Sequence, residues 1–209
     1  NGVPAWAKTL SCDNTSTTVR TVKYSGNNFY LSGHFVGNMN LDAGTLTSNG
    51  TLPDMFIFAV DASGNGLWVR KIKGTGTDYI WRHSCDENGN QFLAGYFNSP
   101  TLQIDSTTTV LSQVTVTNKG SNDMFYVKYN SSGTLQWFKS FGSAADERLI
   151  NADSREGQSI VTGQFGGNID IGGQVIQTKG SNDAVTIKFG TDGSVDEIQT
   201  ANGKLLEAG

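Results

Sequence analysis

The sequence predicts an all-β protein, a β-propeller segment of about three four-stranded blades with a spare terminal strand. Two observations predict this fold class. Three short patterns recur in the same order about every 60 to 70 residues, and the residues between them alternate with the period of two that is typical of strands. No amphipathic stretch with a helical period longer than about two turns competes with this interpretation.

The first recurring pattern is a tryptophan inside a short apolar and basic stretch. It occurs as AWAKTL at Trp6, as LWVRKI at Trp68 and as QWFKSF at Trp137, and a degenerate copy follows near Val195. Each copy predicts one strand of a repeated sheet.

The second pattern is Gly-x-Phe, and it contains Gly33, Gly95 and Gly163. In the first copy Leu31 and Phe35 share one face with the glycine, and the opposite face is also apolar or small. A strand of this kind is expected to be covered on both sides. The repeated glycine predicts a place where a neighbouring sheet comes close.

The third pattern is an aspartate that opens an apolar strand, at Asp54, Asp123 and Asp183. A glycine-containing turn and the next tryptophan strand follow each time, which predicts a hairpin. The three carboxylates could bind a ligand. The expected role is structural, because such a side chain commonly accepts hydrogen bonds from backbone amides of the preceding turn.

The patterns divide residues 1–209, taken as one propeller region, into repeats over about 5–66, 67–134 and 135–194, with a partial copy over 195–209. A β-sandwich is the alternative fold, but it does not predict such regular phasing. The stretches WFKSFGS, GQSIVTGQFGGNIDIGG and KGSNDAVTIKFGTDG resemble the SBBP repeat, a seven-bladed β-propeller repeat of bacterial secreted and cell-surface proteins. The resemblance implies extracellular or cell-surface display and no particular ligand. The second repeat departs from that pattern through its longer corner, IDSTTTVLSQVTVTNKG.

Three blades do not close a ring, since propellers typically have four to eight. The sequence therefore predicts either further blades or self-association. One form of self-association would exchange the Trp6 and Val195 strands between two chains to give six blades.

The composition argues against several classes of partner. The net charge is −4 and no basic run occurs, so a nucleic-acid partner is not expected. No apolar run of membrane-spanning length and no signal peptide is found. Cys12 and Cys85 could form one disulfide or remain free thiols, and their spacing to His34 and His83 matches no metal site. No metal or cofactor and no catalytic residue is predicted, since the common catalytic motifs are absent.

One set of positions is a candidate for ligand binding. His34, Tyr96 and Gln164 are the middle residues of the three Gly-x-Phe patterns, and Tyr79 and Trp81 add aromatic rings nearby. Aromatic rings beside polar groups suit stacking on sugars and contacts with peptides alike.

The sequence thus favours a non-catalytic extracellular or cell-surface module for protein interaction, adhesion or structural assembly. A glycan-binding lectin is the first alternative, and a propeller enzyme acting on a polysaccharide is the second. Fold-level analogy decides among these only weakly.

Overall fold

The computed structural model describes residues 3–13, 16–105, 113–200 and 205–207, and every regular element in them is a β-strand. The predicted fold class is confirmed, because the strands form several four-stranded antiparallel sheets of the kind that make propeller blades. No helix in these ranges is long and apolar enough to cross a membrane.

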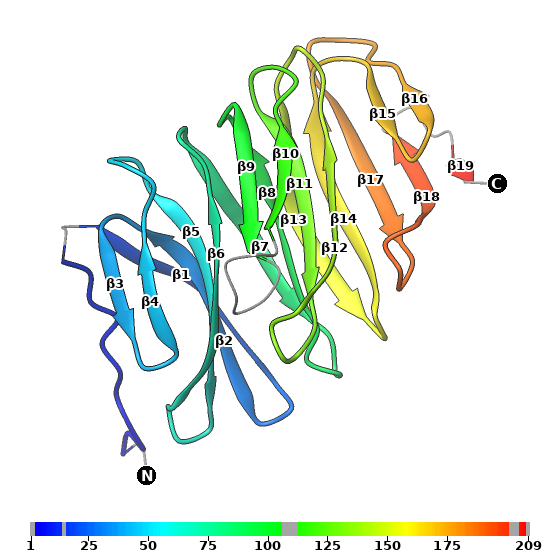
Figure 1. Cartoon of the computed structure of the whole chain (residues 1–209). Helices are drawn as coiled ribbons and strands as arrows, with labels where there is room; N and C mark the ends of the chain where they lie inside the picture. The colour runs from blue at the N-terminus through cyan, green and yellow to red at the C-terminus, as the bar shows by residue number, and fades with distance from the viewer. Residues whose placement is uncertain (1–2, 14–15, 106–112, 201–204, 208–209) are drawn as a thin grey trace.

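Three sheets stand side by side in chain order (Figure 1). The first blade contains β1 (Thr17–Ser25), β2 (Asn28–Phe35), β5 (Asp54–Asp61) and β6 (Gly66–Lys73). The second contains β7 (Asp78–Cys85), β8 (Gln91–Phe97), β11 (Asp123–Tyr129) and β12 (Leu135–Phe141). The third contains β13 (Glu147–Arg155), β14 (Gln158–Phe165), β17 (Asp183–Phe189) and β18 (Val195–Thr200). Within each blade the strands are antiparallel and paired in sequence order.

Each blade also carries a short hairpin between its Gly-x-Phe strand and its aspartate strand, which the count of four strands per repeat missed. These hairpins are β3 (Asn38–Leu41) with β4 (Gly44–Thr47), β9 (Thr101–Asp105) with β10 (Gln113–Thr117), and β15 (Ile169–Ile171) with β16 (Gln174–Ile176). β9 pairs with β6, so that the first sheet has six strands, and β19 (Leu205–Glu207) pairs with β18.

The tryptophan strand is the last strand of a blade, because it pairs with the aspartate strand that precedes it. β18 completes the third blade in this way. Its residue in the register of the tryptophans is Glu197, which lies opposite Lys188 as Trp137 lies opposite Lys128. The strand predicted around Trp6 is not formed. Residues 3–11 contain no strand, and Cys12 makes an isolated antiparallel β-bridge to Met39.

The first strands of the blades, β1, β7 and β13, lie beside one another where the three sheets converge. Each of them contains a β-bulge at the same place, at Arg20, Trp81 and Ile150. A bulge adds one residue on one strand and re-aims its side chain. The bulges therefore give the three blades an equivalent set of redirected side chains.

The bulges also explain the repeated glycine of the Gly-x-Phe pattern. A Cβ placed on Gly33, Gly95 or Gly163 would overlap a backbone carbonyl of the bulged strand. For Gly95 this is the carbonyl of Tyr79, the residue before Ile80, which pairs with Gly95. The expectation that a neighbouring sheet comes close here is wrong. The close approach is made by the adjacent strand of the same sheet.

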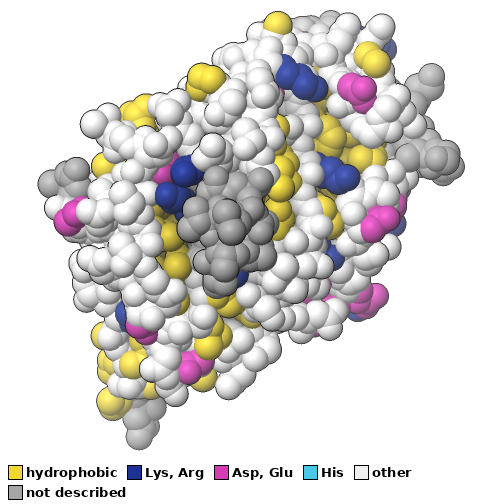
Figure 2. Space-filling model, viewed as in Figure 1, with side chains coloured by type: hydrophobic (Ala, Val, Ile, Leu, Met, Phe, Trp, Pro, Cys, Tyr) yellow, Lys and Arg dark blue, Asp and Glu magenta, His cyan; other side chains and the backbone are white. Residues whose placement is uncertain are grey.

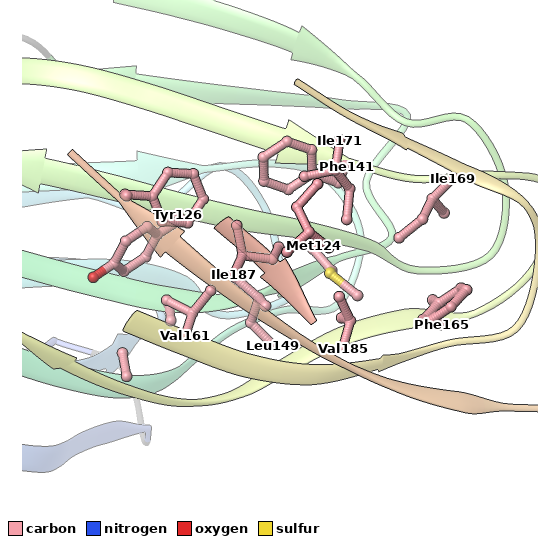
Figure 3. Packing of buried hydrophobic residues seen from close by; sticks show 14 of the residues in the cluster. Met124, Tyr126, Phe141, Leu149, Val161, Phe165, Ile169, Ile171, Val185 and Ile187 are labelled. Atoms are coloured by element: carbon pink, nitrogen blue, oxygen red, sulfur yellow. The ribbon is translucent and has the colours of Figure 1, made fainter. Parts of the chain in front are cut away.

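Apolar side chains fill the spaces between the sheets. Figure 3 shows the core between the second and third blades, where Met124 and Tyr126 meet Val185 and Ile187, all of them buried. The third blade's other face is open, since Ile160 is 45% exposed. The expected two-sided cover therefore fails on that face. On the side shown in Figure 2, hydrophobic side chains gather in patches and stripes, and charged ones are scattered.

Candidate functional site: an aromatic and arginine cluster on the inner strands

The candidate site lies on the converging inner strands of the three blades. Backbone pairing places His34 opposite Thr18, Tyr96 opposite Tyr79, and Gln164 opposite Arg148, at equivalent positions of consecutive sheets. We call His34, Tyr79, Trp81, Tyr96, Arg20 and Arg148 the inner-strand cluster.

Four rings of this cluster form a continuous row. The ring centroids of His34 and Tyr79 are 5.0 Å apart in an edge-to-face arrangement, and those of Tyr79 and Tyr96 are 5.7 Å apart. Trp81 follows at 6.1 Å from Tyr96. These separations are in the range of favourable aromatic pairs. The row therefore joins the first blade to the second.

Two guanidinium groups lie over these rings. The Arg20 guanidinium carbon is 5.4 Å from the ring centroid of Tyr79 and 5.9 Å from that of Trp81, and that of Arg148 is 4.8 Å from Tyr96. Contacts of this kind are attractive cation–π interactions. The cluster is therefore both aromatic and positively charged.

Arg148 is also held by an acidic partner. Its Nε lies 3.0 Å from the Asp146 carboxylate, which accepts a further hydrogen bond from Asn122 Nδ2. Arg20 is exposed. Trp81 is 46% exposed, which is unusual for so large an apolar side chain, while Tyr79 and Tyr96 are half-buried. A ligand could thus reach Trp81 and Arg20 without any movement of the backbone.

His34 closes the buried end of the row. Burial, and then the nearby Arg20, lower its pKa to about 4, so its imidazole is neutral at pH 7. Its Nε2 is buried and has no hydrogen-bond partner among the described residues. The positive charge of the cluster is therefore that of the two arginines.

The structure thus brings together four of the five predicted binding residues, His34, Tyr79, Trp81 and Tyr96. Gln164 lies one blade further along, opposite Arg148 in the register. Sequence reasoning missed Arg20 and Arg148. The signal that could have found Arg20 is its place in the repeat, which is the place of Trp81 in the next blade.

Trp68 and Trp137 each join one blade to the next, and Trp6 joins the N-terminal segment to the first blade. The indole Nε1 of Trp68 donates to Ser131 O at 2.9 Å, that of Trp137 donates to Thr191 O at 3.2 Å, and that of Trp6 donates to Ala62 O at 2.9 Å. Each ring lies against a glycine of the same turn, and these glycines are Gly64, Gly133 and Gly193.

The aspartate anchors accept hydrogen bonds from backbone amides. Asp54 accepts from Asn49 N at 2.7 Å, Asp123 from Lys119 N at 2.8 Å and Asp183 from Lys179 N at 2.6 Å. Burial raises the pKa of Asp54 and of Asp123 to about 6. All three side chains close the connection that leads into their own strand.

The remaining cysteine and histidine side chains lie apart from the inner-strand cluster. Cys12 and Cys85 are free thiols, and the Cys12 thiol donates to Val36 O. In the part of the chain that the structure describes, no three His, Cys, Asp or Glu side chains group as metal ligands would.

His83 is fully buried between the first two blades. Its Nε2 lies 2.7 Å from Gln91 Oε1 and its Nδ1 3.1 Å from Ser32 Oγ. Because an amide oxygen only accepts, Nε2 carries the proton and donates, and Nδ1 accepts from the hydroxyl. Burial lowers the pKa of His83 to about 4.

A pH dependence of stability follows from His83. Its pKa in the unfolded chain is about 6.5. As the pH falls from 6.5 towards 4, the His83 side chain binds a proton in the unfolded chain and not in the folded one, so the contribution of His83 to the free energy of unfolding falls by about 3 kcal/mol. We expect His83→Gln to lack this loss. Denaturant unfolding of both proteins at pH 7.5 and pH 4.5 checks it, and an identical pH dependence would contradict the assignment.

The fold and the site together define a class of protein. The chain is built from propeller-type blades, and an exposed aromatic and arginine surface lies where their inner strands converge.

Comparison with known proteins agrees with this architecture. The chain is 27% identical, over 128 residues, to a protein of Acanthamoeba polyphaga mimivirus named "Uncharacterized WD repeat-containing protein L264". The match covers 58% of this chain and 9% of that protein, so the chain spans a small part of its relative. WD repeats form propeller blades. No family model matches the chain, and the SBBP resemblance is therefore not confirmed.

Proposed function

We propose that this chain is a non-catalytic propeller module that binds a protein ligand through the inner-strand cluster. The observation that supports this most is the exposed indole of Trp81 beside Arg20, backed by the row of half-buried tyrosines. Tryptophan, tyrosine and arginine are the residues most enriched among binding hot spots. The WD-repeat relative agrees with a role in protein interaction.

The chemistry of the cluster favours a peptide segment that carries both a carboxylate and an apolar or planar side chain. A guanidinium whose face rests on an aromatic ring keeps its N–H edges for hydrogen bonds to a carboxylate. Arg20 is placed in this way over Tyr79, and Trp81 offers an apolar surface beside it. Arg148 is already paired with Asp146, so Arg20 is the expected anion contact.

A glycan is the second candidate ligand, because a sugar ring could stack on the exposed indole of Trp81. The extracellular or cell-surface location and a role in adhesion or assembly are part of the proposal. The low proportion of charged residues, 16%, supports them. A polysaccharide-degrading enzyme is the third candidate, and turnover of a polysaccharide that depends on one carboxylate would favour it.

The test is a parallel screen of the protein against a displayed random-peptide library and a glycan array. We expect acidic peptides with an aromatic or aliphatic residue to be selected. Trp81→Ala and Arg20→Gln should each weaken their binding by about 30-fold, the effect of losing a hot spot. The matched control is Val175→Ala, which removes an exposed apolar side chain far along the third blade.

Three outcomes would contradict the proposal. Selected peptides that bind Trp81→Ala as well as the unchanged protein would place the site elsewhere. Sugar-specific binding that Tyr96→Ala abolishes would favour the lectin. Failure to select any peptide or glycan would remove the support for a binding module at this surface.

A further inference from the structure

The tryptophan strand of the first blade, β6, holds the second blade through two residues, not one. In β6, Trp68 lies against Gly133 and donates to Ser131 O, and Arg70 donates from Nε to Gly133 O at 2.6 Å. Arg70 is two residues after the tryptophan and therefore on the same side of the strand. The first blade thus holds the β11–β12 turn of the second by an indole and a cation.

The same clasp is made onto the first blade by the N-terminal segment. Trp6 lies against Gly64 and donates to Ala62 O, and Lys8 donates from Nζ to Gly64 O at 2.6 Å. The spacing of two residues and the acceptor turn, β5–β6, are equivalent to those of β6. Residues 3–11 therefore occupy the place of the last strand of a blade that would precede the first, although no described strand pairs with them.

Beside this segment the first blade has an open apolar groove. The groove has a volume of about 460 Å³, and its walls include Trp6, Leu10, Val19, Val22, Leu31 and Val60. The two valines of β1 project into it.

Comparison of equivalent positions shows what the groove lacks. Val22 lies opposite Leu31 in its sheet, as His83 lies opposite Leu93 and Ala152 opposite Val161. Val22 is 59% exposed, whereas His83 is 0% and Ala152 is 5% exposed. In the second and third blades this position is covered by the blade before it. The groove continues an interface that the molecule already builds twice.

We propose that this groove docks one more blade of the same repeat type. The aspartate strand of that blade would pair antiparallel with residues 3–11, as the aspartate strands of the three described blades pair with their last strands. Its inner face would carry side chains like those that the first two blades turn towards their successors. These are Tyr30, Met55 and Ile57 in the first blade, and Phe92, Met124 and Tyr126 in the second.

The third blade of a second copy does not match this occupant. At the positions of the large apolar residues just named, its open face carries the smaller side chains of Ile160, Ala184 and Thr186. Its last strand has Glu197 at the tryptophan place. The third blade of a second copy would also bring its own last strand, β18. If that blade docked in front of the first blade, β18 would fall at the position that residues 3–11 already occupy. Two last strands would compete for one position.

The test is a chimaera in which a copy of residues 78–135 is fused directly ahead of Ala5 in the full chain. In this graft Leu135 is followed by Ala5 and Trp6. Trp6 therefore takes the position that Trp137 has after Leu135 in the second repeat. We expect amide hydrogen exchange in residues 5–11 to slow at least tenfold relative to the unmodified chain. We also expect the midpoint of thermal unfolding to rise by several degrees.

Val22→Asp separates docking from a merely structural effect. In the unmodified chain, where Val22 faces the groove, the unfolding midpoint should stay within about two degrees. In the chimaera the same change should restore fast exchange in residues 5–11. The matched control is Val175→Asp, which should leave the chimaera protected.

The proposal is overturned if residues 5–11 exchange equally fast with and without the graft, whether the graft itself is folded or not. It is also overturned if the unmodified chain is a dimer by light scattering and Val22→Asp makes it a monomer, because a second copy then fills the groove. Neither result depends on the inner-strand cluster or on the ligand proposed for it.

Discussion

Replacement of Gly95 by alanine is expected to lower the free energy of unfolding by about 3 kcal/mol, at the upper end of the usual cost of overpacking. A Cβ there would overlap the carbonyl oxygen of Tyr79 on the bulged strand β7, and it would also press on the Phe125 ring. The backbone oxygen cannot turn away as a flexible side chain would, because it belongs to the sheet. For a chain of this length, the midpoint of thermal unfolding should fall by about 6–12 °C.

The matched control is Gly180→Ala. No atom lies within 4 Å of a Cβ placed on Gly180, and its backbone is not in the left-handed region, so its stability should change by less than about 0.5 kcal/mol. Thermal unfolding followed by circular dichroism compares the two variants. An unchanged midpoint for Gly95→Ala would contradict the bulge as the reason for the glycine.

Truncation of Trp68 to alanine is expected to have a similar or larger effect, about 3–5 kcal/mol. Its indole is 5% exposed, lies against Gly133 and donates a hydrogen bond to Ser131 O. The positive φ of Gly133, 73°, lets the turn pass close beneath the ring, where a side chain would collide. The change would therefore loosen the contact between the first two blades as well as the core beneath it.

The control for Trp68→Ala is Leu67→Ala, one residue earlier on β6 and pointing the other way. Leu67 is 46% exposed, so its loss should change stability by less than about 1 kcal/mol. Denaturant unfolding measures both. Equal effects of the two substitutions would show that the clasp does not hold the blades together.

The contacts of Trp6, Trp68 and Trp137 all run the same way along the chain, from one segment to the turn of the following blade. Each blade reaches forward onto a turn of the next through an indole, and the third blade has Glu197 at the place of the tryptophan. Its open face also has the smaller side chains of Ile160, Ala184 and Thr186 where the first two blades have large apolar ones. The groove before the first blade and the open face after the third are thus different surfaces, which is why we assign a docking role to the first alone.

The sequence by itself determined the four main strands of each blade, the hairpin that joins each aspartate strand to the strand after it, and the repeat. Alternation of apolar residues after Asp54, Asp123 and Asp183 predicts buried strands, because successive side chains of a strand point to opposite faces. Recurrence of these strands with a tryptophan and a Gly-x-Phe predicts stacked blades. The same phasing selected His34, Tyr96 and Gln164 as equivalent positions, since one place in a repeated sheet stays one place in space.

The tertiary structure alone decided how these positions are used. A β-bulge leaves no reliable mark in the alternation of apolar and polar residues. The direction in which the side chains of Arg20 and Trp81 point, and with it the inner-strand cluster, could therefore not be predicted. The clash that requires Gly95 is likewise with a carbonyl from a strand paired out of simple register. The segment around Trp6 reads as a strand locally, yet it is not one. Strand pairing needs a partner backbone, which only the assembled fold can supply or withhold.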